Sequence, residues 1–258
     1  GWYRKDHQDV AKERIDTLLA RRGLAPSREK ARVLVMAGEV YCSGQRVLKA
    51  DSKVDDTVCL EVRGNPIPYV SFGGVKLKAA LDAFGLSVSG TTALDIGSST
   101  GGFTDCLLQE GAQKVHAVDS GTHQFHEKLR GDRRIVLKEN FNARYMTLED
   151  IGETVDIITV DVSFISLKKI LPAAVGLLGQ RGHIISLVKP QFEVGRYNVG
   201  KGGIVKDREK IEEVLSDIRE FGETLGVKSV QTVEAPREKE RKNREYFILW
   251  ERSDSPSR

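Results

Sequence analysis

The stretch that decides the fold is Leu94-Asp95-Ile96-Gly97-Ser98-Ser99-Thr100-Gly101-Gly102-Phe103, in which an apolar run passes through a glycine-rich turn directly into a helical pattern. The next apolar run ends at Asp119, which lies 22 residues after Gly97. Glycines in such a turn let the backbone approach a ligand closely, and a carboxylate at the end of the next strand can accept hydrogen bonds from both ribose hydroxyls. The stretch therefore predicts a nucleotide-cofactor site.

The spacing of these glycines bears on which cofactor is bound. The pattern is GxxxGG rather than GxGxxG, so Ser99 takes the place of the middle glycine that admits a pyrophosphate. Asp95 also suits a ligand bearing an ammonium and a sulfonium better than one bearing phosphates. We therefore favour S-adenosylmethionine over NAD, with an ordinary tight strand–helix turn as the alternative. The predicted cofactor-binding residues of this region are Asp95, Gly97, Ser98, Ser99, Thr100, Gly101, Gly102, Phe103 and Asp119.

Strand-like and helical patterns alternate around this stretch. Helical patterns such as Phe103–Glu110 and Asp207–Phe221 separate short apolar runs that are rich in β-branched residues. This alternation predicts an α/β fold with a doubly wound, mostly parallel sheet. The predicted strands are Ala93–Ile96, Lys114–Val118, Ile135–Leu137, Val155–Val160, His183–Val188, Val227–Val233 and Tyr246–Trp250.

The N-terminal part of the chain is distinctly basic. Residues 12–53 contain ten Lys and Arg against five Asp and Glu, a net charge of +5, whereas the remaining chain is near −2. A helical pattern ends at Gly23, Ser27 is placed to cap a second one, and β-like runs follow at Val40–Tyr41 and Val58–Val62. This predicts a basic module attached to a roughly neutral domain, with a solvated helical face as the alternative interpretation of its charge.

Composition sets further limits. With 258 residues, 30% of them charged and 40% hydrophobic, the chain has the balance of a globular protein with one large domain and a smaller module. Its three cysteines form no CxxC pair and its five histidines no ligand pattern, so we expect a reducing cytoplasm and no metal. The longest apolar stretch next to a helix has about nine residues, whereas a membrane span takes roughly twenty. We interpret residues 1–11 as a leader or an expression remnant.

Two further strand ends carry ionisable groups at the edge where open α/β sheets bind ligands. The run Val155–Val160 is followed by Asp161, and the run His183–Val188 by Lys189. A carboxylate and a lysine at one edge can carry out proton transfer, although a helix cap and a solvated strand end are the alternatives. Lys76 and Lys78 flank the first leucine of an apolar helical stripe, and periodicity does not decide which of them faces the site.

Five segments resemble the TlyA-type family, whose members have often been labelled haemolysins. They are Tyr69–Leu77 (YVSFGGVKL), Asp95–Phe103, Asp161–Leu167 (DVSFISL), Val188–Gly195 (VKPQFEVG) and Asn243–Phe247 (NREYF). The resemblance implies a ribosomal-RNA 2′-O-ribose methyltransferase that acts on cytidine, uses S-adenosylmethionine and has ribosomal RNA or ribosomal subunits as partners. It also implies an FtsJ-like domain, a Rossmann-like class I methyltransferase with a seven-stranded, mostly parallel sheet.

The basic segment resembles the alpha-L module of ribosomal protein S4, a small α+β RNA-binding domain. We therefore divide the chain into a leader (1–11), an S4-type domain (12–63), a linker (64–68), an FtsJ-like domain (69–252) and a tail (253–258). The linker falls in a segment with two prolines and a glycine, which can continue neither a helix nor a strand. Residues expected to contact RNA are Arg14, Arg21, Arg22, Arg28, Lys30 and Arg32, together with Phe164, which either stacks on the target nucleotide or belongs to the core.

The family's catalytic tetrad corresponds here to Lys76, Asp161, Lys189 and Glu245. Lys189 would be the general base, the two carboxylates would orient the lysine ammonium groups, and Asp161 would also bind the cofactor. The chain departs from the family pattern at Phe72, Ser120, Thr122 and Asn140 and in the turn Arg241–Asn243. Because Phe72 and Asn140 stand where the family usually has arginines, an RNA-binding protein with a degenerate methyltransferase domain is the alternative function. A membrane-lytic haemolysin is a weaker one, since no segment is long enough to insert.

Overall fold

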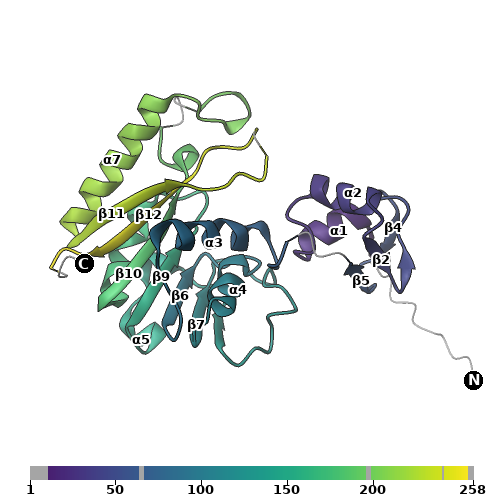
Figure 1. Cartoon of the computed structure of the whole chain (residues 1–258), viewed down its shortest axis with the longest axis horizontal. Helices are drawn as coiled ribbons and strands as arrows, with labels where there is room; N and C mark the ends of the chain where they lie inside the picture. Colours follow the sequence, from purple (N-terminus) through teal and green to yellow (C-terminus); the bar gives the residue numbers. More distant parts are fainter. Residues whose placement is uncertain (1–10, 64–66, 196–198, 240, 255–258) are drawn as a thin grey trace, which may run out of the picture. The chain divides into compact units, whose positions relative to one another are not determined.

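The computed structural model describes residues 11–63, 67–195, 199–239 and 241–254 and divides the chain into two compact units (Figure 1). Unit 1 extends to Ser71 and unit 2 begins at Phe72. The expected linker 64–68 lies partly outside the described residues, as do the expected leader and tail. Their boundaries stay predictions.

Unit 1 is a small α+β domain, as the basic segment predicts. Its two helices share one core, in which Leu18, Leu19 and Ala31 are fully buried. Ser27 caps the second helix by accepting a hydrogen bond from the backbone N–H of Lys30 at 3.1 Å. The elements are β1 (Lys12–Arg14), α1 (Ile15–Arg21), α2 (Arg28–Met36), β2 (Val40–Cys42), β3 (Gln45–Arg46), β4 (Lys53–Asp55) and β5 (Leu60–Val62), with β1 paired to β4 and β2 paired to β3 and β5.

Unit 2 contains a seven-stranded sheet in the order β11-β12-β10-β9-β6-β7-β8. Neighbouring strands from β10 to β8 are parallel, and β12 is antiparallel to both β10 and β11. The predicted seven-stranded, mostly parallel sheet is therefore confirmed. The strands are β6 (Thr92–Ile96), β7 (Lys114–Val118), β8 (Ile135–Lys138), β9 (Val155–Val160), β10 (Leu178–Val188), β11 (Val227–Glu234) and β12 (Tyr246–Arg252).

Helices cover both faces of this sheet. Buried residues of α5, α6 and α7 form one core with Ile248 of β12. The preceding residue, Phe247, points to the opposite face, where its ring centroid lies 6.0 Å from that of Phe103 on α4, and α4 packs against α3. The helices are α3 (Phe72–Phe84), α4 (Gly102–Gln109), α5 (Leu148–Ile151), α6 (Leu171–Leu177) and α7 (Arg208–Thr224), with 3₁₀ turns η1 (Ala143–Tyr145), η2 (Leu167–Lys169), η3 (Pro190–Phe192) and η5 (Lys201–Gly203).

The strand order places the chemistry-bearing loops together. The chain runs outward from β6 to β7 and β8 in one direction, then returns to β9 and β10 on the other side of β6. Ligands in open α/β sheets bind at such a reversal, outside the carboxyl ends of the strands. The loops that follow β6, β7, β8 and β9 all begin at that edge.

Candidate active site

The glycine-rich turn after β6 is fixed by close backbone packing. Gly97 has a φ of +81°, and a Cβ added to it would lie 1.9 Å from the carbonyl oxygen of Asp161. Gly101, which caps α4, has a φ of +99°, and a Cβ there would lie 2.6 Å from Leu129. Both positions combine a left-handed backbone with a lack of space for a side chain, so the turn requires glycine at each.

Asp119 follows β7 and lies against the same turn. Its Oδ2 accepts a hydrogen bond from the backbone N–H of Ser99 at 2.8 Å, and its Oδ1 accepts one from Gly121 at 2.7 Å. An ionised carboxylate has about four acceptor positions, so two remain for a ligand. The carboxylate thus holds the glycine turn and still faces the cleft.

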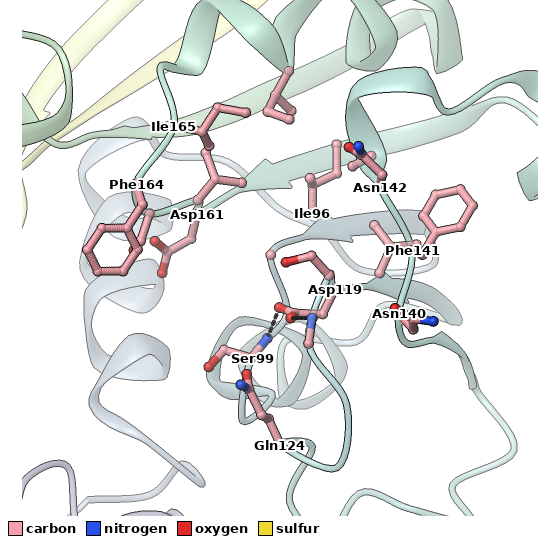
Figure 2. Close-up of a pocket in the computed structure, with 18 residues that line it drawn as sticks. Ile96, Ser99, Asp119, Gln124, Asn140, Phe141, Asn142, Asp161, Phe164 and Ile165 are labelled. Carbon is pink, nitrogen blue, oxygen red and sulfur yellow. Dashed lines mark hydrogen bonds between the residues drawn. The ribbon is translucent and has the colours of Figure 1, made fainter.

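A cleft of about 660 Å³ opens at this edge of the sheet. Figure 2 shows Asp161 and Phe164 on one side, Asn140 and Phe141 on the other, and Asp119 between them. Of the predicted cofactor-binding residues, four line the cleft: Gly97, Ser99, Asp119 and Asp161. The other six are not among the residues that line it: Asp95, Ser98, Thr100, Gly101, Gly102 and Phe103.

Asp95 is fully buried within β6. Its carboxylate accepts hydrogen bonds from the hydroxyls of Thr104 at 2.8 Å and Thr159 at 3.0 Å. Burial raises the pKa of Asp95 to about 7, and the two hydroxyl groups oppose that rise. In this arrangement Asp95 links β6 to α4 and β9 behind the glycine turn rather than facing a ligand.

Asp161 and Lys189, expected from the two strand ends, form an ion pair. Lys189 Nζ lies 2.6 Å from Asp161 Oδ1 and donates a hydrogen bond to Ser163 Oγ at 2.9 Å. The parallel pairing of Ser186 with Val160 brings the carboxyl ends of β10 and β9 to the same level. Two residues that are distant in the sequence thus contact each other at the sheet edge where the strand ends predict them.

Lys76 and Glu245 form a second ion pair, with 2.8 Å between Nζ and Oε1. The antiparallel pairing of Val188 with Tyr246 places Glu245 next to Lys189 along the sheet, and Gln191 donates to Glu245 Oε2 at 3.2 Å. Lys78 is directed elsewhere, because its ammonium pairs with Asp82 and Glu110. Of the two lysines, Lys76 is therefore the one that contacts Glu245, and its catalytic role stays a prediction.

Phe164 is the most exposed large hydrophobic residue at this edge, with 90% of its surface accessible. Its φ of +63° is unusual for an aromatic residue, and its ring centroid lies 5.0 Å from that of Phe192. The alternative that Phe164 belongs to the core is therefore wrong. The ring is thus exposed at the cleft, and its stacking on a nucleotide stays a prediction.

Several cleft residues were not predicted from the sequence. They follow β7, β8 and β9 at their carboxyl ends, so the same rule applied to every strand would have included them. Asn140, which has a φ of +51°, and Ser120 were noted only as departures from a family pattern. The others are Gly121, Gln124, Phe141, Asn142, Ala143, Val162, Ser163, Ile165 and Ile170. Ile96 and Val118, the last residues of β6 and β7, also line the cleft.

The arginines of unit 1 differ in their surroundings. Arg14 and Arg28 both contact the buried carboxylate of Asp16, at 2.9 and 3.3 Å, and line a cavity of about 450 Å³ together with Arg32. The guanidinium of Arg22 instead donates to the backbone carbonyls of Val58, at 2.6 Å, and Asp56. The expected RNA contact at Arg22 is thus a link within the fold.

The two remaining candidates on these helices are accessible. Arg21 is exposed and pairs with Glu13 at 2.7 Å, and Lys30 is exposed on α2.

All three cysteines are free, and the described residues contain no group of three or more potential metal ligands. Within the same part of the chain, no helix has both the length and the apolar character that crossing a membrane requires.

The sheet order and the cleft at its carboxyl edge define an α/β protein of the nucleotide-cofactor class. Residues 69–252 match the FtsJ-like methyltransferase family, and residues 13–57 match the S4 domain. The chain therefore belongs to the FtsJ-like methyltransferase family. Membership in this family implies S-adenosylmethionine as the methyl donor.

Similar proteins confirm the resemblance to the TlyA type. The 16S/23S rRNA (cytidine-2′-O)-methyltransferase TlyA of Mycobacterium tuberculosis is 43% identical over 243 residues, which are 94% of this chain and 90% of that protein. YqxC of Bacillus subtilis, which carries an rRNA methyltransferase name, is 49% identical over 216 residues, 83% of this chain and 77% of that protein. A solved structure of a Streptococcus thermophilus protein with a hemolysin name gives a TM-score of 0.79 at 42% identity and covers 96% of this chain and 90% of its own.

Proposed function

We propose that this chain transfers a methyl group from S-adenosylmethionine to the 2′-hydroxyl of a cytidine ribose in ribosomal RNA. The observation that carries the proposal is a set of two lysine–carboxylate contacts: Lys189 with Asp161, which lines the cleft, and Lys76 with Glu245, which lies next to Lys189 along the sheet. The substrate follows the names of similar proteins, in particular the TlyA of Mycobacterium tuberculosis. Family membership alone would leave the acceptor atom open.

The cleft residues fit the cofactor. A volume of about 660 Å³ lies within the range of sites for ligands of this size. Asp119 keeps acceptor positions for ribose hydroxyls, the turn from Gly97 to Ser99 offers backbone close to the ligand, and Phe141 and Ile165 supply apolar surface for a base. When bound, S-adenosylmethionine supplies an electrophilic methyl group on a sulfonium. Asp95 would act behind the turn by holding it, and Asp161 would face the donor.

Lys189 is the proposed general base. Once the Lys189 ammonium has given up its proton to solvent, its Nζ would take the proton of the ribose hydroxyl as the O–H bond breaks and the oxygen accepts the methyl group. Asp161, 2.6 Å away, would hold the ammonium that forms, and the pair of Lys76 and Glu245 would fix the neighbouring wall and orient the hydroxyl. General-base catalysis of this kind contributes roughly 10²–10⁴-fold to the rate.

Two different sets of side chains would bind the RNA: an aromatic ring that stacks on a base and cationic groups that contact phosphates. The exposed ring of Phe164 would stack on the target base, as aromatic side chains do with unpaired bases. Arg14, Arg28 and the neighbouring basic residues of unit 1 would contact phosphates, which position the RNA without reading its sequence. The expected partner is accordingly ribosomal RNA or a ribosomal subunit.

Methyl transfer by a Lys189→Ala variant tests the chemistry. We expect the rate on ribosomal RNA to fall at least 100-fold while the affinity for S-adenosylmethionine stays within about tenfold, because the lysine acts on the hydroxyl. Lys210→Ala, which changes a lysine of α7 outside the cleft, is the control. Equal losses of rate and cofactor affinity would make Lys189 a cofactor contact, and wild-type turnover would remove it from the mechanism.

Calorimetry with S-adenosylmethionine separates the enzyme from an RNA-binding protein with a degenerate methyltransferase domain. We expect the chain to bind S-adenosylmethionine and not NAD. We expect the Asp119→Ala variant to bind S-adenosylmethionine with lower affinity. RNA binding without any heat from S-adenosylmethionine or its demethylated product would favour the degenerate domain instead. Departures from the family pattern at Phe72 and Asn140 are the sequence features that motivate this alternative.

A further inference from the structure

Asp16 is a fully buried carboxylate within the basic unit 1. It lies in the first turn of α1, and its Oδ1 accepts hydrogen bonds from Arg14 Nε at 3.0 Å and from the backbone N–H of Thr17 at 2.8 Å. Its Oδ2 accepts from Arg14 Nη2 at 2.9 Å and from Arg28 Nε at 3.3 Å. One carboxylate thus holds two arginines that come from the starts of two different helices.

The two arginines keep donors that point away from Asp16. Arg14 uses Nε and Nη2 for the carboxylate, and Arg28 uses only Nε, so within the described part of the chain Arg14 Nη1 and both terminal nitrogens of Arg28 carry no assigned bond. Their side chains are 35% and 55% exposed, whereas that of Asp16 is 0% exposed. The donors therefore face solvent while their orientation is set from inside the fold.

These donors line the cavity of about 450 Å³ in unit 1. Arg32 and Lys49 add two further cations, and Asp51 is the one carboxylate among the lining residues. The apolar side chains of Met36 and Leu48, 87% and 85% exposed, lie at the same cavity. Guanidinium groups match phosphate oxygens in geometry and charge, so the cavity favours a phosphate over a neutral ligand.

We propose that this cavity binds a backbone phosphate of RNA and that Asp16 is the positioning residue that orients Arg14 and Arg28 for it. The inference rests on the proposed RNA-binding role of unit 1. It adds Lys49 and the cavity itself to the expected contacts and gives Asp16 a role although it touches no ligand. A lower pKa of Asp16, to about 2, is consistent with a carboxylate that stays ionised between two guanidinium groups.

Charge and geometry make opposite predictions for Asp16→Asn. Removing a negative charge from a basic surface strengthens its attraction to a polyanion, so a purely electrostatic role predicts tighter RNA binding. Loss of the anchor frees two long side chains that must then be ordered on binding, which opposes association. The positioning role therefore predicts weaker binding despite the more positive surface.

Fluorescence anisotropy with the full chain and a labelled 20-nucleotide RNA hairpin shows whether Asp16→Asn binds RNA more weakly or more tightly. We expect Asp16→Asn to bind about tenfold more weakly than the unchanged chain. The charge-matched control is Asp55→Asn, which removes an exposed carboxylate of β4 outside the cavity and should bind equally or up to a few-fold more tightly. Asp16→Asn binding as tightly as Asp55→Asn would overturn the positioning role.

A second variant keeps the test decisive if Asp16→Asn does not fold. Arg14→Lys preserves the charge but loses the paired contact with Asp16, and we expect it to bind the hairpin several-fold more weakly with an unchanged salt dependence. Affinity equal to that of the unchanged chain would overturn the inference.

The double variant Arg14→Ala with Arg28→Ala separates this inference from the proposed function. Unchanged affinity and salt slope in that variant would refute RNA binding by these arginines altogether. If the double variant weakens binding and flattens the slope while Asp16→Asn does not weaken it, RNA binding stands and only the role of Asp16 fails.

Discussion

Replacing Gly97 by alanine tests how tightly the glycine turn is built. The new Cβ would lie 1.9 Å from the carbonyl oxygen of Asp161, which is backbone and cannot rotate away. A left-handed φ of +81° costs alanine roughly 1–2 kcal/mol, and overpacking costs a further 1–3 kcal/mol. We therefore expect Gly97→Ala to destabilise unit 2 by about 3 kcal/mol, a fall in Tm of about 10 °C for a unit of this size.

Gly90→Ala is a matched control for the backbone contribution. Gly90 has a φ of +74°, and a Cβ there would meet nothing within 4 Å, so only the left-handed strain applies. This variant should lose about 1–2 kcal/mol and keep the cleft intact. The difference between the two variants, about 2 kcal/mol, isolates the clash with Asp161.

Thermal unfolding followed by the fluorescence of buried Trp250, in a Trp2→Phe background, measures both variants in unit 2. Calorimetry with S-adenosylmethionine provides a second measurement, because a displaced Asp161 changes the wall of the cleft. Only Gly97→Ala should lose affinity for the cofactor. Equal Tm values and equal cofactor affinities for the two variants would refute the argument that the turn packs against the backbone of Asp161.

Three other changes test the buried polar groups. The pKa of Asp16 is lowered to about 2, so this carboxylate stabilises the fold by about 2 kcal/mol above pH 4, and that stability is lost as the pH falls from about 4 to about 2. In Asp16→Asn, the free energy of unfolding should lack this pH-dependent part in acid unfolding. The pKa of Asp95 is raised to about 7, so the free energy of unfolding falls as the pH rises from about 4 to about 7. In urea unfolding, Asp95→Asn should therefore be more stable than the unchanged chain at pH 8 but not at pH 4. Ser186→Ala removes the 2.8 Å acceptor of the buried Trp250 Nε1–H and should cost about 1–3 kcal/mol in the same measurement, whereas no change would mean that the indole finds another partner.

Much of the sheet could be predicted because its central strands β6, β7, β9 and β10 are apolar and largely buried. All seven predicted runs are strands, and Asp119, Asp161 and Lys189 lie at the expected edge. The short elements of unit 1 were harder, since β1 and β4 have three residues each and carry no periodic pattern. Their pairing depends on contacts between segments about 40 residues apart, which local sequence does not specify.

The direction of single side chains could not be predicted from spacing. Asp95 precedes the glycine turn by two residues, yet its side chain leaves β6 toward Thr104 and Thr159. The contact between Lys76 and Glu245 joins residues 169 positions apart and requires β12 to lie beside β10. Arg22 resembles its neighbours in sequence, but the loop around Val58 turns its guanidinium inward.

The loop after β9 is also held at its far end. Glu193 Oε2 accepts a hydrogen bond from Ser166 Oγ at 2.7 Å, and Oε1 accepts one from the backbone N–H of Leu167 at 2.7 Å. Burial raises the pKa of Glu193, and both donors oppose that rise by stabilising the ionised form. The carboxylate thereby fixes the start of η2, where the loop ends.

Contacts at both ends make the segments 161–167 and 189–193 one structural unit. Lys189 contacts Asp161 at the start of the loop, Phe192 packs against Phe164 in its middle, and Glu193 holds its end. The segments follow adjacent parallel strands, so their relative position is set by the sheet and then locked by side chains. A displacement of either segment would therefore alter the lysine–carboxylate pair and the exposed ring together.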